Sequence, residues 1–211
     1  MAAVLDADVL RLVAITDSLR DGIDGLAGRA AAAVRGGATM VQLRLPDESP
    51  RVLAEAARAL RDAVSGVPLL VVDRADVALA TGADGVHVGS DGILPAALRR
   101  VVPDGFIIGV SVGADDDLVR VSGADYAGIG PVFVAGGASA GSGAIGVERF
   151  QVLAQQCGVP AVAIGGIAPH TAGAAMAAGA AGVAVISALF GAADPMQAAR
   201  ALRSALDATG R

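Results

Sequence analysis

Short apolar runs alternate with longer stretches rich in Ala, Leu and Arg along the whole of this 211-residue chain. The runs are rich in Val and Ile and mix few polar side chains with the apolar ones, as parallel strands buried on both faces do. Strands are therefore expected at residues 11–16, 39–44, 68–73, 85–89, 106–111, 126–130, 161–165 and 182–187. Helices are expected between and after them, at residues 23–35, 49–64, 75–81, 95–101, 115–121, 147–156, 171–178 and 195–207.

Repeated strand-helix units with no linker predict an α/β fold, a TIM (β/α)8 barrel that forms a single domain over residues 1–211. The competing architecture is an open doubly wound sheet. Its phosphate-binding fingerprint, G-x-G-x-x-G, would follow the first strand. Here the sequence after Thr16 is D-S-L-R-D-G instead, so the barrel is favoured.

Composition narrows the class of partner. The chain is 54% apolar and 18% charged, with a net charge of −5, and its basic residues are scattered. No basic stripe for nucleic acid or polybasic membrane patch is present. The uncharged stretch 150–193 is interrupted by Pro160 and Gly165-Gly166, which argues against a membrane span. With one cysteine and no signal peptide, a cytoplasmic protein is expected.

Polar residues gather at the expected carboxyl ends of the strands, where barrel enzymes build their sites. The most specific local pattern is I-G-G-I after strand seven together with V-I-S-A-L-F after strand eight. Loops at these two places commonly bind a phosphate through backbone N–H groups, and glycine lets the backbone come close to it. Gly165, Gly166, Ile186 and Ser187 are therefore expected to form a phosphate cradle; two tight turns without a ligand are the alternative.

Four further residues at strand ends are candidates, each with a simpler explanation. Gln42 and Arg44 share one face of strand two, and Arg44 is either an anion ligand or the partner of a nearby surface acid. Asp73 is either a ligand for Mg²⁺ or the N-cap of the following helix. Asp91 is either a second metal ligand or a turn residue before Gly92.

The two histidines and the cysteine carry less weight. His87 is expected to pack inside the barrel, and His170 to face solvent at the start of helix seven. Neither pairs in sequence with a nucleophile and a carboxylate, so a Ser-His-Asp triad has little support. Cys157, without a nearby base, is expected to be inert.

The loop G-P-V-F-V-A-G-G-A-S-A-G-S-G-A-I-G, residues 130–146, contains no acid, base or aromatic residue except one Phe. Loops of this length are uncommon unless they have a function. Its position after strand six predicts that it borders the site.

The motif string resembles the thiamine phosphate synthase family, which also includes the thiazole tautomerases. The motifs are L-V-A-I-T-D, G-G-A-T-M-V-Q-L-R, V-D-R-A-D-V-A-L-A-T-G-A-D-G-V-H-V-G, I-I-G-V-S, G-A-D-Y-A-G-I-G-P-V-F, A-I-G-G-I and V-A-V-I-S. The resemblance implies a TIM barrel and a transferase of thiamine biosynthesis. Its reaction joins hydroxymethylpyrimidine pyrophosphate to thiazole phosphate and releases pyrophosphate with the help of Mg²⁺.

The resemblance also implies roles for the strand-end residues. Gln42, Arg44, Asp73 and Ser111 match the pyrimidine pyrophosphate side, with Arg44 and Ser111 as the catalytic candidates. Gly166, Ile186 and Ser187 match the thiazole phosphate cradle. Asp73 and Asp91 are the candidate Mg²⁺ ligands, and the partners implied are small phosphorylated substrates. Relatives suggest small homo-oligomers.

Several positions depart from the family pattern, and each departure removes a polar group. Pro46 replaces a basic residue, Val72 replaces Asn, and the second metal carboxylate falls on Gly92. In the loop after strand six a Thr-x-Thr/Ser-Lys pattern is replaced, at the positions Ala135, Gly137 and Ala138. The losses lie on the pyrophosphate and metal side, whereas the phosphate cradle is intact.

Three functions are therefore expected from the sequence, with synthase first. The second is a thiazole tautomerase-like isomerase, which needs no pyrophosphate or Mg²⁺, although Pro131 stands where the tautomerase pattern has His. The third is a catalytically impaired or repurposed phosphate-binding barrel.

Overall fold

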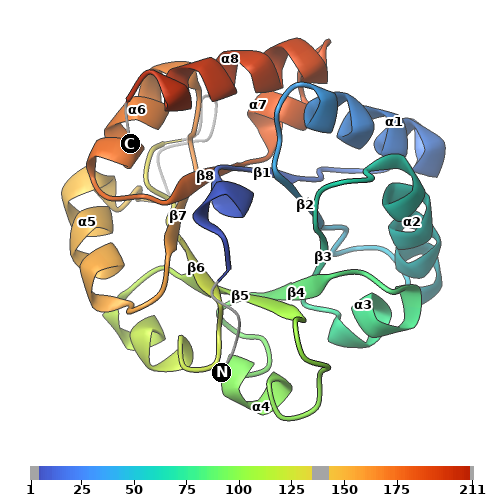
Figure 1. The fold of residues 1–211 in the computed structure, drawn as a ribbon, viewed down its shortest axis with the longest axis horizontal. Helices are drawn as coiled ribbons and strands as arrows, with labels where there is room; N and C mark the ends of the chain where they lie inside the picture. The colour runs from blue at the N-terminus through green and yellow to red at the C-terminus, as the bar shows by residue number, and fades with distance from the viewer. Residues whose placement is uncertain (1–4, 135–142, 210–211) are drawn as a thin grey trace.

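The computed structural model describes residues 5–134 and 143–209 and shows a closed barrel of parallel strands in sequence order, β1 to β8 (Figure 1). The strands are β1 (Leu12–Ile15), β2 (Met40–Leu43), β3 (Leu69–Val72), β4 (Gly85–Val88), β5 (Ile107–Val112), β6 (Tyr126–Ile129), β7 (Ala161–Ile164) and β8 (Gly182–Val185). β1 pairs with both β2 and β8, which closes the ring. The predicted TIM barrel is thereby confirmed.

Helices surround the strands as an outer ring in Figure 1. They are α1 (Gly22–Arg35), α2 (Pro50–Ala63), α3 (Ala75–Thr81), α4 (Pro95–Leu98), α5 (Gly146–Gln156), α6 (Pro169–Ala177), α7 (Ser187–Phe190) and α8 (Pro195–Asp207), with the 3-10 helices η1 (Ala7–Leu10) and η2 (Asp115–Arg120). The segment 115–121, expected as an α-helix, forms only η2. Three consecutive acids fill its first turn, and only a short connection joins β5 to β6.

Two apolar layers hold the barrel together. The outer layer lies between strands and helices and includes Leu53, Ile108 and Phe150. The inner layer fills the barrel itself, where Val13, Met40 and Leu70 pack together with Leu10 of η1. None of the described helices is long and apolar enough to cross a membrane.

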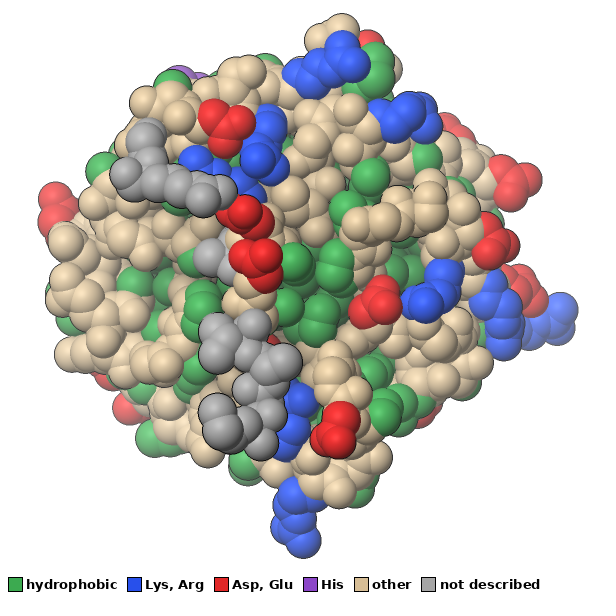
Figure 2. Space-filling view, viewed as in Figure 1, with side chains coloured by type: hydrophobic (Ala, Val, Ile, Leu, Met, Phe, Trp, Pro, Cys, Tyr) green, Lys and Arg blue, Asp and Glu red, His purple; other side chains and the backbone are tan. Residues whose placement is uncertain are grey.

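The amino ends of the strands are closed off. Figure 1 shows η1 over the centre of the barrel, and Leu10 belongs to the inner apolar layer. Figure 2, from the same side, shows apolar side chains near the centre of this face with acidic and basic ones around them. Glycines in the left-handed conformation lie in the turns that lead from the helices back to this end. Gly82 (φ 68°) ends α3. At Gly123 (φ 87°) an added Cβ would come within 2.8 Å of Ala96. The interior of the barrel is therefore closed at this end by η1.

Candidate active site

Three cavities meet at the carboxyl ends of the strands. A cavity of about 490 Å³ lies over β7 and β8, and one of about 300 Å³ lies over β5 and β6. Ile164 and Gly165 line both of them. A small cavity of about 20 Å³ extends into the barrel below, between Gln42, Ser111 and their neighbours. The arrangement provides room for two ligands side by side.

The first half of the predicted phosphate cradle is the turn after β7. Gly165 (φ 92°) and Gly166 (φ 63°) both adopt backbone angles that favour glycine. A Cβ on Gly165 would lie 2.6 Å from Cα of Pro131, and one on Gly166 would lie 2.5 Å from the carbonyl oxygen of Phe133. Glycine is therefore required here by the close packing of the loop after β6, a reason that the sequence alone did not indicate.

The second half of the cradle is the start of α7. Ile186 precedes this four-residue helix without a side-chain cap, and Ser187 is its first residue. The first N–H groups of a helix have no partner within it and are free for an anion. The structure brings the four predicted cradle residues together: Gly165, Gly166, Ile186 and Ser187 all line the 490 Å³ cavity, and the exposed His170 lines it as well.

On the other side of the site, four polar side chains are joined inside the barrel. The Gln42 amide nitrogen donates to the Tyr126 hydroxyl at 2.8 Å. The His87 Nδ1 lies 3.0 Å from the same hydroxyl, and its Nε2 lies 3.1 Å from Oγ of Ser111. Burial lowers the pKa of His87 to about 4 despite the charge of Asp73, so the ring is neutral at physiological pH. His87 is buried as expected.

Arg44 follows β2 and its side chain is exposed. Its backbone is held by Thr16, whose hydroxyl accepts from the Arg44 N–H at 2.8 Å and donates to its carbonyl at 3.1 Å. Among the described residues the guanidinium has neither an ion pair nor a hydrogen bond, so the expected alternative of a surface ion pair is absent there. The cation remains available for a ligand.

Asp73 follows β3 with φ 61°, a left-handed angle that Asp tolerates better than most residues. Its Oδ1 accepts from the N–H of Gly89 at 2.7 Å. The alternative role as the N-cap of α3 is wrong, because the cap position is Arg74 and it has no side-chain cap bond. The carboxylate instead points across to the turn after β4.

That turn carries Asp91, which is exposed and lies next to Gly92 as the turn interpretation predicted. The Gly92 N–H donates to the carbonyl of Gly89 at 3.1 Å. Arg120 of η2 reaches into the turn, and its Nη2 donates to the Gly92 carbonyl at 2.6 Å. In the part of the chain that the structure describes, no three His, Cys, Asp or Glu side chains are grouped as metal ligands.

The loop after β6 is described only at its two ends. Phe133 donates its N–H to the Gly165 carbonyl at 3.0 Å, and Ile145 donates to the Pro131 carbonyl at 2.8 Å. Both anchors therefore border the site as predicted. Ala135, Gly137 and Ala138 lie outside the described residues.

Tyr126 and Arg120 are the two site residues that the sequence analysis missed. Tyr126 is the first residue of β6, at the amino end of its strand, yet its long side chain reaches Gln42. A search of the carboxyl ends alone could not find it. That it is the one tyrosine of the chain and lies in an apolar strand was an available signal.

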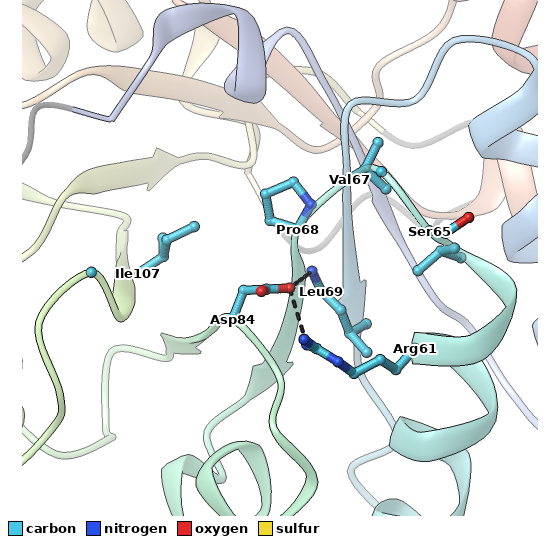
Figure 3. A pocket seen from close by; sticks show the side chains of 10 residues that line it. Arg61, Ser65, Val67, Pro68, Leu69, Asp84 and Ile107 are labelled. Atoms are coloured by element: carbon cyan, nitrogen blue, oxygen red, sulfur yellow. Dashed lines mark hydrogen bonds and ion pairs between the residues drawn. The ribbon is translucent and has the colours of Figure 1, made fainter.

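A further cavity, of about 560 Å³, lies at the opposite end of the barrel (Figure 3). Its two charged residues are used by the fold: Asp84 accepts from the Leu69 N–H at 2.8 Å and from Arg61 at 3.5 Å. Figure 3 shows both contacts converging on the Asp84 carboxylate. Although this cavity is larger than the cavities over the carboxyl ends, its charged side chains are engaged with each other and with the backbone, so the candidate site is the carboxyl end.

Comparison with known families gives a match to the thiamine monophosphate synthase model over residues 12–189. The thiamine-phosphate synthase of Azorhizobium caulinodans is 43% identical over 206 residues, covering 96% of this chain and 97% of that protein. The enzyme of the same name from Xanthobacter autotrophicus is 44% identical over 201 residues, covering 93% and 95%.

Solved structures agree with the sequence comparison. A thiamine phosphate pyrophosphorylase from Pyrococcus furiosus superposes with a TM-score of 0.86 at 32% identity, over 97% of this chain and 99% of that one. A 3-hexulose-6-phosphate synthase, with a TM-score of 0.74 at 21% identity over 92% and 99%, shares the fold.

Proposed function

The chain belongs to the thiamine monophosphate synthase family, and we propose that it is a transferase that makes thiamine phosphate. The substrates are hydroxymethylpyrimidine pyrophosphate and thiazole phosphate. The bond from the pyrimidine methylene carbon to the pyrophosphate oxygen breaks, and pyrophosphate leaves with the electron pair. The thiazole nitrogen supplies its lone pair to form the new carbon–nitrogen bond.

The observation that carries this proposal is the pair of adjoining cavities. The cradle of Gly166 and Ser187 lines one of them, and Ser111 lines the other, with Ile164 and Gly165 between. Thiazole phosphate would bind in the first cavity and the pyrimidine in the second. Two reactants held side by side in this way react as though within one molecule, which removes a large entropic part of the barrier.

Positive charge is needed where pyrophosphate departs. The exposed Arg44 guanidinium, free of described partners, would bind the pyrophosphate oxygens. Arg74 is less suited to replace the lost basic residues, because Asp76 holds it with bonds of 2.8 and 2.6 Å. Arg120 is better placed than Arg74 to replace a lost basic residue. It contacts the turn at Gly92, where the second metal carboxylate would stand.

The residues present fit Mg²⁺, which often takes one or two carboxylates together with substrate phosphates. Asp73 would hold the ion, because only its Oδ1 is engaged by a described hydrogen bond. The exposed Asp91, in the turn after β4, would supply a second carboxylate. When bound, Mg²⁺ would neutralise the charge that develops on the leaving pyrophosphate. Gly92 contributes no carboxylate.

We also propose that turnover is slower than in relatives that keep the full set of polar groups. Pro46, Val72 and Gly92 each remove a donor or ligand on the pyrophosphate side. Loss of one donor at a developing charge typically costs two to three decades in rate, or about 3 kcal/mol. The cradle is unaffected by these replacements.

One observation favours the isomerase as a second candidate. His170 lines the cradle cavity, where a thiazole phosphate would bind, and an isomerase needs a group there that can move a proton. Pro131, at the position of the tautomerase histidine, argues against it.

Calorimetric titration of the purified protein with thiazole phosphate, and then with the pyrimidine pyrophosphate plus Mg²⁺, separates these functions. We expect both to bind and thiamine phosphate to form in a subsequent turnover assay. Binding of thiazole phosphate alone would exclude the synthase and leave the isomerase. Binding of neither would leave a repurposed barrel.

A further inference from the structure

The chain of side chains Gln42–Tyr126–His87–Ser111 crosses the inside of the barrel from β2 to β5. All four line the same 20 Å³ cavity below the site. Ser111, at the upper end of the chain, also lines the 300 Å³ cavity proposed for the pyrimidine. The reaction proposed above assigns no task to His87 or Tyr126.

The barrel makes room for this chain with two glycines. In the register of the sheet, Gly109 lies between His87 and Tyr126. A Cβ on Gly109 would lie 2.5 Å from both His87 Nδ1 and the Tyr126 hydroxyl oxygen. A Cβ on Gly128 would lie 3.1 Å from the His87 ring. Any side chain at Gly109 would separate the imidazole from the phenol.

The direction of the chain follows from its first member. The amide nitrogen of Gln42 can only donate, so the Tyr126 oxygen accepts at that contact. The phenol has one hydrogen, which is left for the contact with His87. Tyr126 therefore donates to Nδ1 of His87, and Nδ1 accepts.

The rest of the chain is then determined. A neutral imidazole whose Nδ1 accepts carries its hydrogen on Nε2. The ring is buried and its two described side-chain partners are hydroxyls rather than carboxylates, so the neutral form is favoured. Nε2 therefore donates to Ser111 Oγ, and the hydroxyl hydrogen of Ser111 is left free for another partner.

We propose that His87 and Tyr126 are positioning residues that fix Ser111 as a hydrogen-bond donor to the ligand and leave Gln42 its amide oxygen as acceptor. The proposal deepens the assignment of this cavity and rests on the proposed function for the identity of the ligand. Ser111 then offers its hydroxyl hydrogen to a ring nitrogen or an oxygen acceptor of the ligand. The chain of side chains therefore favours entry of the acceptor-bearing edge of a heteroaromatic ring.

The ring-nitrogen chemical shifts of the histidines test the polarity directly, with no ligand present. The chain has two histidines, so the His170→Gln variant leaves the signals of His87 alone. We expect the neutral Nε2–H tautomer near pH 7. The Nδ1–H tautomer, or a charged ring, would overturn the proposal.

A change at Gln42 should reverse the chain. In Gln42→Glu, the carboxylate accepts from the Tyr126 hydroxyl, which must then accept from Nδ1. We expect His87 to switch to the Nδ1–H tautomer in this nearly isosteric variant. If His87 keeps the Nε2–H tautomer in Gln42→Glu, Gln42 does not set the polarity and the proposal fails.

Binding kinetics separate positioning from a merely structural effect. In Tyr126→Phe we expect the tautomers of His87 to mix and KM for the pyrimidine pyrophosphate to rise about tenfold, with a smaller change in kcat, as the loss of one hydrogen bond implies. Val183→Ala, in the outer apolar layer, is the control for destabilisation and should change neither tautomer nor KM. An unchanged tautomer and KM in Tyr126→Phe would count against the proposal.

These measurements remain decisive if the proposed function is wrong. If the wild-type protein binds no pyrimidine pyrophosphate, the synthase assignment fails. The tautomers of the wild type and of Gln42→Glu still establish or overturn the polarity of Ser111.

Discussion

Gly92 lies directly against the carboxylate of Asp73: a Cβ built on Gly92 would be 3.2 Å from Oδ1. The family pattern places its second metal carboxylate at this position, so the missing side chain would have stood next to the retained one. The same turn is held by Arg120, which donates to the Gly92 carbonyl. The backbone position for a second carboxylate next to Asp73 is therefore present, but the residue there, Gly92, has no side chain.

Gly92→Asp should therefore strengthen magnesium binding. Without metal, two adjacent carboxylates repel each other, and we expect a loss of about 1 kcal/mol in stability. With Mg²⁺ the variant should gain more in melting temperature than the wild type, because the ion binds only the folded form. Gly92→Asn, of equal size but uncharged, is the control. Equal Mg²⁺ responses of the Asp and Asn variants would contradict the metal assignment.

Ser187→Asp should abolish binding of thiazole phosphate. The new carboxylate would lie in the cradle cavity beside Gly166 and repel the phosphate. Ser187→Ala keeps the backbone N–H groups and should lose no more than about tenfold in affinity, the worth of one hydrogen bond. Calorimetry on both variants measures this difference. Unchanged affinity in Ser187→Asp means that the phosphate binds elsewhere.

Much of the fold was predictable because most strands are short apolar runs between breakers, as in L-L-V-V of β3. The observed strands differ from the expected ones by one or two residues at their ends. η1 was not predicted, because A-D-V-L has no helical periodicity and is placed by the packing of Leu10 into the barrel. Local sequence patterns identify strands and helices. The position of η1 depends instead on packing against strands that are distant in the sequence.

The candidate site divides in the same way. Gln42 and Ser111 were found because they sit at strand ends, where the fold concentrates ligand contacts. Tyr126 was missed because it lies at the amino end of β6 and reaches Gln42 of β2 only across the interior of the closed barrel. Asp73 was ambiguous because its role depends on a backbone angle, φ 61°, that turns the carboxylate away from α3.

Arg44→Ala should weaken binding of the pyrimidine pyrophosphate without affecting stability. The side chain is exposed and has no described partner, so the free energy of unfolding should change by less than about 0.5 kcal/mol. A lost charged hydrogen bond should reduce affinity by roughly 10- to 100-fold. Arg44→Lys keeps the charge but not the planar guanidinium, so its affinity should lie between those of the wild type and Arg44→Ala. Equal affinities for wild type and Arg44→Ala would remove Arg44 from the site.

His87 should make the protein sensitive to acid. Its pKa is lowered from 6.5 to about 4 in the folded state, so the unfolded chain takes up the proton first as the pH falls. The stabilising contribution is present above pH 6.5 and is lost toward pH 4, by roughly 3 kcal/mol. Urea unfolding at a series of pH values should show a smaller slope over this range in His87→Gln than in wild type. His170→Gln, at an exposed position, should keep the wild-type slope; equal slopes for all three proteins would contradict the assignment.

Tyr126 should resist ionisation until the protein unfolds in alkali. Burial raises its pKa well above the ordinary value of 10.0, an effect that the hydrogen bond from Gln42 only partly offsets. The unfolded chain therefore loses the phenolic proton first, and stability falls as the pH rises above about 10. The chain has one tyrosine and no tryptophan, so tyrosinate absorbance reports this residue alone. We expect the absorbance to appear together with loss of the far-UV circular dichroism signal, and Tyr126→Phe to lack it. Tyrosinate formed near pH 10 in the still folded protein would show that the phenol is accessible to water and that its bonds to Gln42 and His87 are not maintained.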